Sequence, residues 1–181
     1  MKEILHFTTM RNWEKIAKSG FVEPRSDPLW CFNFEERKSD TYRKYDEKYN
    51  GQLFIVGIPP GSYDAWVDWG LNLVHHAQDS IVLSEPWNYT KPQVSLKIPV
   101  SDLKNILVRE HRHLSKIEYE KVYGDVNPIG FQDSRFYPRQ KIKYIDSTVY
   151  LNEYGGNYDV PEIWLPYKVP LSIVTVNFSD K

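Results

Sequence analysis

The sequence predicts a single domain that mixes helices with short strands, of the α+β class. The chain has 181 residues, which suits one domain with a sizeable core. Seven or so apolar runs of strand length are interleaved with three or four segments of helical periodicity. Hydrophobic residues make up 41% and aromatic residues 15% of the chain, a composition that excludes a disordered protein. No repeat, low-complexity tract or long linker divides the chain.

The opening segment predicts a strand, a tight turn and a helix. Ile4–Phe7 is a short apolar strand that carries one histidine, His6. Thr8 or Thr9 is placed to cap the helix, because a threonine hydroxyl accepts a hydrogen bond from a free N–H of the first turn. The buried face of the helix is expected to hold Trp13, Ile16 and Ala17. Gly20 suits the left-handed conformation that ends a helix.

The next part of the chain predicts a loop, a strand and a charged helix. Phe21–Pro28 contains two prolines and reads as a loop. Leu29–Phe34 is an aromatic run of strand length, and Cys31 inside it is not expected to act as a nucleophile. Glu35–Tyr49 is dense in charge, with tyrosines at helical spacing, which indicates a solvated helix whose tyrosines lean on the body of the domain.

The remaining segments predict further short elements. Gln52–Ile58 reads as a strand that Pro59 stops, and residues 63–74 read as an amphipathic helix. The later runs predict strands at residues 80–84, 94–100 and 106–108 and a helix at residues 117–123. Near the C-terminus, Glu162 stands at the head of an apolar strand, followed by a proline-bounded turn and a second strand over residues 171–176.

The sequence also indicates the cellular location of the protein. No apolar run approaches the roughly 20 residues that span a bilayer, so no membrane partner is expected. Met1 leads directly into the first strand, which predicts no signal peptide. Cys31 is the single cysteine and fits a reducing compartment. These features together predict a cytoplasmic protein.

Two basic stretches are candidates for nucleic-acid contact. Lysines and arginines number 23 against 24 acidic residues, so any such contact must come from local patches. Residues 109–116 are the most basic run, and residues 134–144 interleave basic and aromatic side chains, a mixture that suits single-stranded nucleic acid. The candidate phosphate contacts are Arg109, Arg112, Lys116, Arg135, Arg139 and Lys141. An ordinary charged surface is the open alternative for both stretches.

The histidines do not predict a metal site. His75-His76 and His111-x-His113 offer ligands, but the chain has no cysteine cluster and no His-Glu-x-x-His pattern. Gly-x-Ser-x-Gly, P-loop and Gly-x-Gly-x-x-Gly sequences are also absent. We therefore expect no metal and none of the reactions those motifs serve.

Two motifs at opposite ends of the chain carry a resemblance to a known family. The first reads His-Phe-Thr-x-x-x-Asn-Trp over residues 6–13 and continues to Ser19-Gly20. The second reads Glu-Ile-Trp-Leu over residues 162–165, then Val169-Pro170 and an Ile-x-x-Val continuation. Together they resemble bacterial ADP-ribosyltransferases, and in particular the DarT-like toxins that modify DNA. The resemblance implies a split β-sandwich of two mostly antiparallel sheets with flanking helices and an NAD cleft between the sheets.

The same resemblance implies roles for individual residues. Glu162 matches the catalytic glutamate, and His6 matches the histidine that holds a ribose hydroxyl of NAD, with Phe7 and Thr8 beside it at the nicotinamide. Arg37 is the best match to the arginine that binds the pyrophosphate and assists the chemistry, with Arg43 as a substitute. The Asn-Pro-Met that tends to follow the family arginine is absent here. Candidates for stacking on the nicotinamide ring are Tyr42 and Trp30.

The sequence thus predicts an NAD-dependent mono-ADP-ribosyltransferase with no metal. The expected acceptors are DNA, RNA or a protein, in that order of preference. Such enzymes often serve as toxins in toxin–antitoxin or phage-conflict systems, which implies an antitoxin partner. The alternatives are NAD hydrolysis, RNA 2′-phosphate transfer, and an inactive transferase fold that binds nucleic acid or protein.

Overall fold

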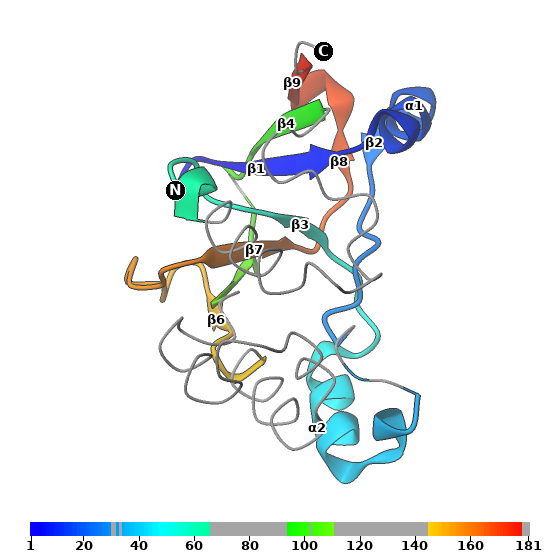
Figure 1. Cartoon of the computed structure of the whole chain (residues 1–181), viewed down its shortest axis with the longest axis vertical. Coiled ribbons are helices and arrows are strands. Elements are labelled where there is room, and N and C mark those ends of the chain that lie inside the picture. The colour runs from blue at the N-terminus through cyan, green and yellow to red at the C-terminus, as the bar shows by residue number, and fades with distance from the viewer. Residues whose placement is uncertain (30–31, 33, 66–93, 102, 111–144, 179–181) are drawn as a thin grey trace, which may run out of the picture.

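The fold is described from a computed structural model of the whole chain (Figure 1). It covers residues 1–29, 32, 34–65, 94–101, 103–110 and 145–178. The helical elements there are α1 (Met10–Ser19), α2 (Asp40–Tyr49) and the short 3₁₀ helices η1 (Glu36–Lys38) and η5 (Leu171–Ile173). The strands are β1 (Glu3–Thr8), β2 (Phe21–Val22), β3 (Ile55–Gly57), β4 (Val94–Pro99), β5 (Leu107–Glu110), β6 (Val149–Tyr150), β7 (Pro161–Leu165), β8 (Val169–Pro170) and β9 (Thr175–Phe178).

These strands form antiparallel sheets. One sheet has the order β1-β4-β9 and another the order β3-β7-β5-β6, while β2 pairs with β8. Every strand pair within them is antiparallel. Helices and antiparallel strands in this arrangement confirm the α+β class (Figure 1).

The two larger sheets meet at a close crossing of β1 and β3. The backbone N–H of Leu5 donates to the carbonyl oxygen of Ile58 at 2.9 Å, and the N–H of Ile58 returns the bond to Leu5 at 2.9 Å. Gly57 lies beside this bridge, where a Cβ atom would stand 2.6 Å from the carbonyl oxygen of Leu5. The crossing therefore requires a residue without a side chain at position 57.

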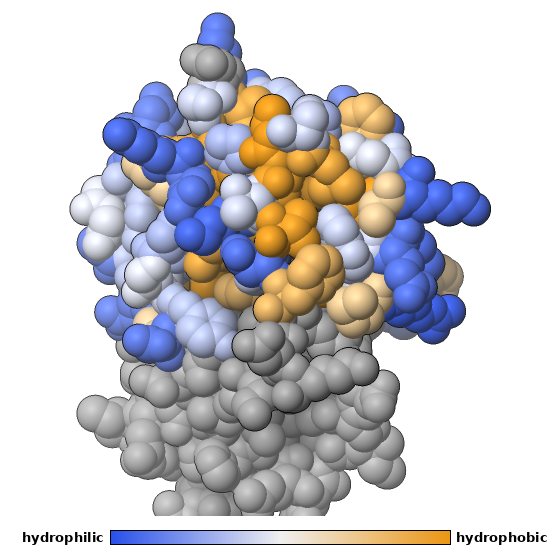
Figure 2. Space-filling view, turned by 90° about the horizontal axis from the view of Figure 1, so that it is seen from above, coloured by the Kyte–Doolittle hydropathy of each residue, from blue (hydrophilic) through white to orange (hydrophobic). Residues whose placement is uncertain are grey.

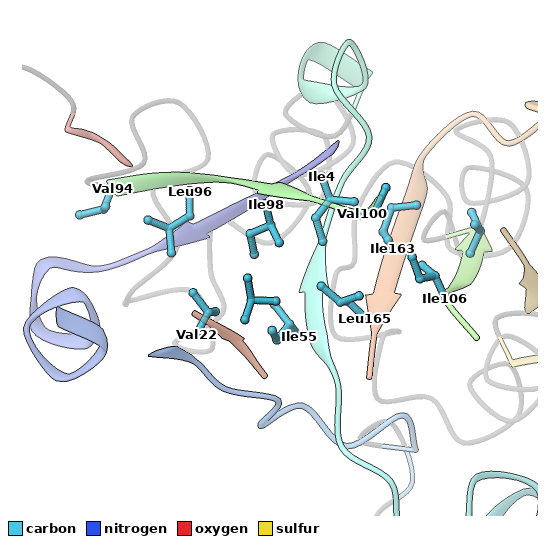
Figure 3. Packing of buried hydrophobic residues seen from close by; sticks show 12 residues of the cluster. Ile4, Val22, Ile55, Val94, Leu96, Ile98, Val100, Ile106, Ile163 and Leu165 are labelled. Atoms are coloured by element: carbon cyan, nitrogen blue, oxygen red, sulfur yellow. The ribbon is translucent and has the colours of Figure 1, made fainter. Parts of the chain in front are cut away.

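The main core is aliphatic and is built from both sheets (Figure 3). Trp13 and Ile16 of α1 pack against it, so the helix covers one side. The buried residues of this main core are Ile4, Val22, Ile55, Val94, Leu96, Ile98, Val100, Ile106, Val108, Ile163, Leu165 and Val169.

A second core lies on the opposite face of β7. Side chains alternate along a strand, so Ile163 and Leu165 enter the main core while Trp164 points the other way. Tyr45 and Tyr49 of α2 pack there, as the tyrosine spacing predicts. The buried residues of this aromatic core are Leu29, Phe32, Tyr45, Tyr49, Phe54, Ile145 and Trp164.

The predicted start and end of the first helix are confirmed. Thr9 is the N-cap, and its hydroxyl accepts a hydrogen bond from the N–H of Asn12 at 3.3 Å. Gly20 ends the helix with φ 74°. Ala17 is exposed rather than buried, because the helix turns only Trp13 and Ile16 toward the core.

Two predictions for the segment after this helix are wrong. Phe21 and Val22 pair with β8 instead of starting a loop. Among the described residues of 29–34, none is in a strand: the N–H of Leu29 bonds to the Asp27 carboxylate, and the N–H of Phe32 bonds back to Leu29. By accepting this hydrogen bond, the Asp27 side chain favours a turn here over the backbone pairing of a strand.

The other predicted elements have mixed outcomes. The strands at residues 94–100 and 106–108 are confirmed as β4 and β5. The charged helix is confirmed, with a break at Ser39, whose hydroxyl caps α2 by accepting from Tyr42 N–H. Residues 171–176 are not one strand, because η5 precedes β9. A helical turn begins at Tyr63, and the rest of that prediction, with those for residues 80–84 and 117–123, lies outside the described residues.

Apolar side chains reach the surface at the end of the molecule that carries α1 and β9. Phe178 of β9 and Ile173 of η5 are each more than half exposed. The Phe178 ring packs edge-on against Trp13 with centroids 5.7 Å apart. Figure 2 looks onto this end and shows apolar residues gathered on it. Among the described strands, β9 is the last of its sheet.

Candidate functional site

His6 is held by a backbone carbonyl of the neighbouring strand. Its Nδ1 lies 2.6 Å from the carbonyl oxygen of Val56. A carbonyl oxygen only accepts, so Nδ1 carries the proton and Nε2 of the neutral ring is an acceptor. Burial lowers the pKa of His6, and the bond to Val56 opposes that effect without cancelling it. The ring is therefore neutral near pH 7, and Nε2 is suited to receive a hydroxyl group.

His6 stands where β1 and β3 separate. If the antiparallel pairing of Leu5 with Ile58 continued for two more residues, the N–H of Phe7 would donate to the carbonyl oxygen of Val56. The imidazole donates to that same oxygen. β1 thus pairs with β3 at one point and then continues along β4 as far as Thr8, which lies opposite Val94. The Phe7 ring packs against Tyr63 with centroids 5.3 Å apart.

Glu162 lies on the aromatic-core face of β7. Only 7% of the residue is exposed. The Nε1–H of Trp164, two residues along the strand and on the same face, donates to Glu162 Oε2 at 3.1 Å. Arg109 of β5 is directly opposite Glu162 in the ladder and so shares this face. The Glu162 carboxylate therefore accepts from one indole, and its face of the sheet also carries a guanidinium on the neighbouring strand.

The structure corrects one of the predicted nucleic-acid contacts, Arg109. It was expected on a basic surface, but its side chain is fully buried. Nε donates to the hydroxyl of Thr148 at 2.6 Å and Nη1 donates to the carbonyl oxygen of Pro28 at 2.7 Å. Its guanidinium carbon lies 5.1 Å from the ring centre of Tyr49 and 4.6 Å from that of Trp164. A phosphate group outside the protein cannot reach a cation enclosed in this way.

His6 and Glu162 lie on strands separated only by β3. β3 pairs with β7 in a register that, continued by one residue, puts Ile58 opposite Glu162, and Leu5 is opposite Ile58 on the other side. Two strand spacings place the two backbones about 10 Å apart. The side chains leave opposite faces, however: His6 shares the face of Ile4 in the main core, while Glu162 shares that of Trp164.

The predicted pyrophosphate ligands are engaged with acidic partners. Arg37 Nη2 lies 2.9 Å from Asp27 Oδ2, and its Nε donates to the carbonyl oxygen of Phe32 at 3.2 Å. The Arg37 side chain is 40% exposed. Arg43 pairs with Asp40 on the surface of α2. Both arginines lie on or beside η1 and α2, and α2 packs into the aromatic core on which Glu162 also lies.

Tyr42 stands between Arg37 and the aromatic core. The Arg37 guanidinium lies 5.6 Å from the Tyr42 ring centre, and the ring packs edge-on against Phe32 at 5.4 Å. Trp30, the other stacking candidate, lies outside the described residues, as do five of the nucleic-acid candidates: Arg112, Lys116, Arg135, Arg139 and Lys141.

Sequence reasoning missed the residues that hold Glu162 in place. Glu110 follows Arg109 on β5, and its carboxylate accepts from the N–H groups of Asp159 and Val160 at 2.8 and 3.0 Å. It thereby fixes the segment that leads into β7. The signal in the sequence was the acidic residue beside a basic one at the end of an apolar strand, but only the strand register pairs Arg109 with Glu162.

Within the described residues, no three histidine, cysteine or acidic side chains gather as they would around a metal ion. The same residues hold no helix with the length and apolar character of a membrane span. No protein-family model matches the chain, and no curated protein or solved structure is similar to it.

Proposed function

We propose that this protein is an NAD-dependent mono-ADP-ribosyltransferase. The observation that carries the proposal is the position of the two motifs. The N-terminal His-Phe-Thr strand and the C-terminal glutamate strand lie on either side of β3, although most of the chain separates them. Two motifs that resemble one family and meet around one short strand favour a common site over two coincidences.

The proposed reaction exchanges one bond at the ribose for another. The bond from ribose C1′ to the nicotinamide nitrogen breaks with its electron pair, and neutral nicotinamide leaves. An acceptor nucleophile forms the new bond to C1′, and its proton passes to a general base. The transition state has oxocarbenium character, so a carboxylate beside the ribose stabilises its developing positive charge. Glu162 is the carboxylate proposed for both roles.

His6 and the arginines supply binding. Nε2 of His6 accepts a hydrogen bond from a ribose hydroxyl, which the tautomer fixed by Val56 allows. Arg37 would exchange the carboxylate of Asp27 for pyrophosphate oxygens, since its planar fork suits either partner. The side chains of His6 and Glu162 leave opposite faces of the sheet. A dinucleotide that contacts both must therefore pass the point where β1 separates from β3.

The finer parts of the proposal concern the acceptor and the biological role. DNA is the preferred acceptor, ahead of RNA and protein, because the N-terminal motif resembles the DNA-modifying toxins most. A toxin of this kind implies an antitoxin that blocks it.

Transfer of label from NAD tests the function. Purified protein is incubated with NAD labelled in the adenylate part, together with DNA, RNA or cell lysate, and nicotinamide release is followed in parallel. We expect label on a macromolecule, and a loss of at least about a hundredfold in rate for Glu162→Gln. Glu153→Gln is the matched control, because Glu153 is an exposed glutamate in the turn after β6.

The remaining outcomes separate the alternatives. Nicotinamide release without transferred label identifies NAD hydrolysis instead. Wild-type protein that releases no nicotinamide with any acceptor contradicts an enzyme of this class. Transfer that survives Glu162→Gln removes the glutamate from the mechanism.

A further inference from the structure

Trp164 is a side chain that the structure joins directly to Glu162. Its Nε1–H donates to Glu162 Oε2 at 3.1 Å, from two residues along β7 and on the same face of the strand. Only 1% of Trp164 is exposed, and an indole N–H can only donate, so this carboxylate oxygen satisfies a buried donor. The hydrogen bond therefore ties the position of the carboxylate to that of the ring.

We propose that Trp164 is a positioning residue for Glu162: its indole N–H holds one carboxylate oxygen and thereby keeps the group in a single orientation for the transfer reaction. This inference rests on the proposed function above and assigns Trp164 no contact with the substrate. Glu162 remains the group that meets the ribose, and Trp164 acts only through it.

Packing holds the indole ring in place. The ring of Phe54 meets it edge-on with centroids 5.6 Å apart, and the guanidinium carbon of Arg109 lies 4.6 Å from its centre. Val56 of β3 and Leu107 of β5 are its direct cross-strand neighbours, and both pack against the aromatic core. Turning the ring away from the carboxylate would displace these neighbours from a close-packed interior. The N–H is therefore a fixed donor.

A fixed donor restricts a flexible acceptor. A glutamate side chain that makes no bond samples several rotamers, and ordering it for a reaction costs conformational free energy. A hydrogen bond to a carboxylate is charge-assisted and stronger than one between neutral groups. It also favours the ionised form over the protonated form, which is a poorer acceptor. The indole therefore favours an ordered and ionised Glu162, the state that the proposed chemistry uses.

Trp164 also lies beside the residue that holds the N-terminal motif. Val56 is directly opposite Trp164 in the ladder, and its carbonyl oxygen accepts from the His6 imidazole. One position of β3 thus borders the contacts of both motifs. The orientations of His6 and Glu162 are therefore set from neighbouring points of the same sheet.

The other charged or titratable groups described around this face of the sheet must be separated from Glu162 in any pH experiment. They are Arg109 of β5, Tyr45 and Tyr49 of α2, and Asp146. Arginine stays charged at every pH used. Burial and the bond to Asp146 raise the pKa of Tyr45 to about 12, so it stays neutral. A response that disappears in Glu162→Gln is assigned to Glu162 and not to Asp146.

Nuclear magnetic resonance of the indole group tests the contact. In ¹⁵N-labelled protein, the Trp164 Nε1–H signal is assigned by its absence in Trp164→Phe. We expect its chemical shift to follow the protonation of Glu162 as pH falls, because the hydrogen bond weakens when the acceptor loses its charge. Glu162→Gln should abolish that response. An indole signal that behaves alike in wild type and Glu162→Gln overturns the proposal.

Kinetics in the transfer assay test the positioning role. Trp164→Phe removes the N–H but keeps an aromatic ring in the core. We expect kcat to fall at least about tenfold with KM for NAD unchanged, because a misplaced reacting group slows the chemical step. The acid limb of the pH profile should also move to higher pH, since the carboxylate loses a donor. Trp13→Phe, on α1 and packed against the main core, is the matched control and should change neither.

A tryptophan analogue keeps the test valid if Trp164→Phe does not fold. Benzothienylalanine at position 164 carries sulfur in place of the ring N–H and preserves the shape of the indole, so it leaves no cavity. It should lower kcat and move the acid limb as Trp164→Phe does. A wild-type kcat and pH profile in the analogue reject the role of Trp164, because the ring then acts only by filling the core.

Failure of the proposed function is a separate result. In that case wild-type protein transfers no label and releases no nicotinamide, while the Trp164 indole signal still titrates with Glu162. The positioning role then falls with the function, although the contact is real. Active transfer that the analogue does not slow leaves the function standing and rejects the inference alone.

Discussion

The two faces of β7 differ sharply in composition. On one face Ile163 and Leu165 enter a core that is aliphatic throughout. On the other, Glu162 and Trp164 lie among aromatic rings with the fully buried Arg109. Burying a charged group costs free energy that an apolar residue would not cost, so stability alone does not explain the charged face. The charged groups carried by this part of the sheet therefore lie on the aromatic side, while Ile163 and Leu165 make the other face of β7 apolar.

The largest effect should follow from removing the buried arginine of the aromatic side. Arg109→Met is expected to lower the free energy of unfolding by about 3–4 kcal/mol, because it takes the donor away from the Thr148 hydroxyl and the carbonyl oxygen of Pro28 and the cation away from the rings of Tyr49 and Trp164. On the aliphatic side Leu96→Ala should cost about 3 kcal/mol through a cavity. Urea denaturation of both variants measures the two losses. An Arg109→Met variant as stable as wild type would show that these contacts contribute little to the fold.

The crossing that joins the two sheets should give the next largest effect. A Cβ at position 57 would lie 2.6 Å from the carbonyl oxygen of Leu5, and that neighbour is backbone, which yields less readily than a side chain. Gly57→Ala is expected to destabilise the protein by about 2–3 kcal/mol. Gly155→Ala is the control, since a Cβ there meets no atom within 4 Å. Thermal unfolding of both variants checks the contrast, and equal behaviour would mean that β1 does not approach β3 this closely.

The smallest effect concerns the pH dependence that His6 adds. Burial lowers the pKa of His6 from 6.5, so the unfolded chain binds the proton more tightly than the folded protein. Stability is then lost as pH falls below about 6.5, with a slope of no more than about 1.4 kcal/mol per pH unit for one proton. The loss is complete once pH is below the pKa of the folded state. Unfolding free energies of wild type and His6→Gln across pH 4–8 measure this, and parallel curves would contradict it.

Local signals in the sequence were enough for the elements that depend on nearby residues. Thr9 and Gly20 bound α1 as expected, because caps act within one turn. Tyr45 and Tyr49 are buried in the aromatic core as their spacing indicated. The strand predicted at residues 29–34 is wrong because the Asp27 carboxylate accepts a hydrogen bond from the N–H of Leu29. Strand propensity does not report such a side-chain hydrogen bond.

The sequence selected the residues of the candidate site but did not specify their arrangement. The motifs selected His6 and Glu162, and the structure places them two strands apart. Their opposite faces follow from the register of β1 with β3 and of β3 with β7, which no local pattern specifies. Arg109 was assigned to a surface because its neighbours in sequence are basic, whereas its burial comes from the pairing of β5 with β7. Charge counts along a chain do not distinguish an exposed basic run from one that begins inside a sheet.

The bonds of Glu110 to Asp159 and Val160 have a consequence for how strands β5 and β7 find each other during folding. A slip of one residue would turn the glutamate and tryptophan of β7 toward the aliphatic interior and expel its isoleucine and leucine. The same slip would break both hydrogen bonds to Glu110, which hold the segment just before β7. A shifted register is thus unfavourable for two reasons: it buries a charged residue in the aliphatic core, and it breaks the hydrogen bonds to Glu110. We therefore expect one register of β5 with β7 to be selected early in folding.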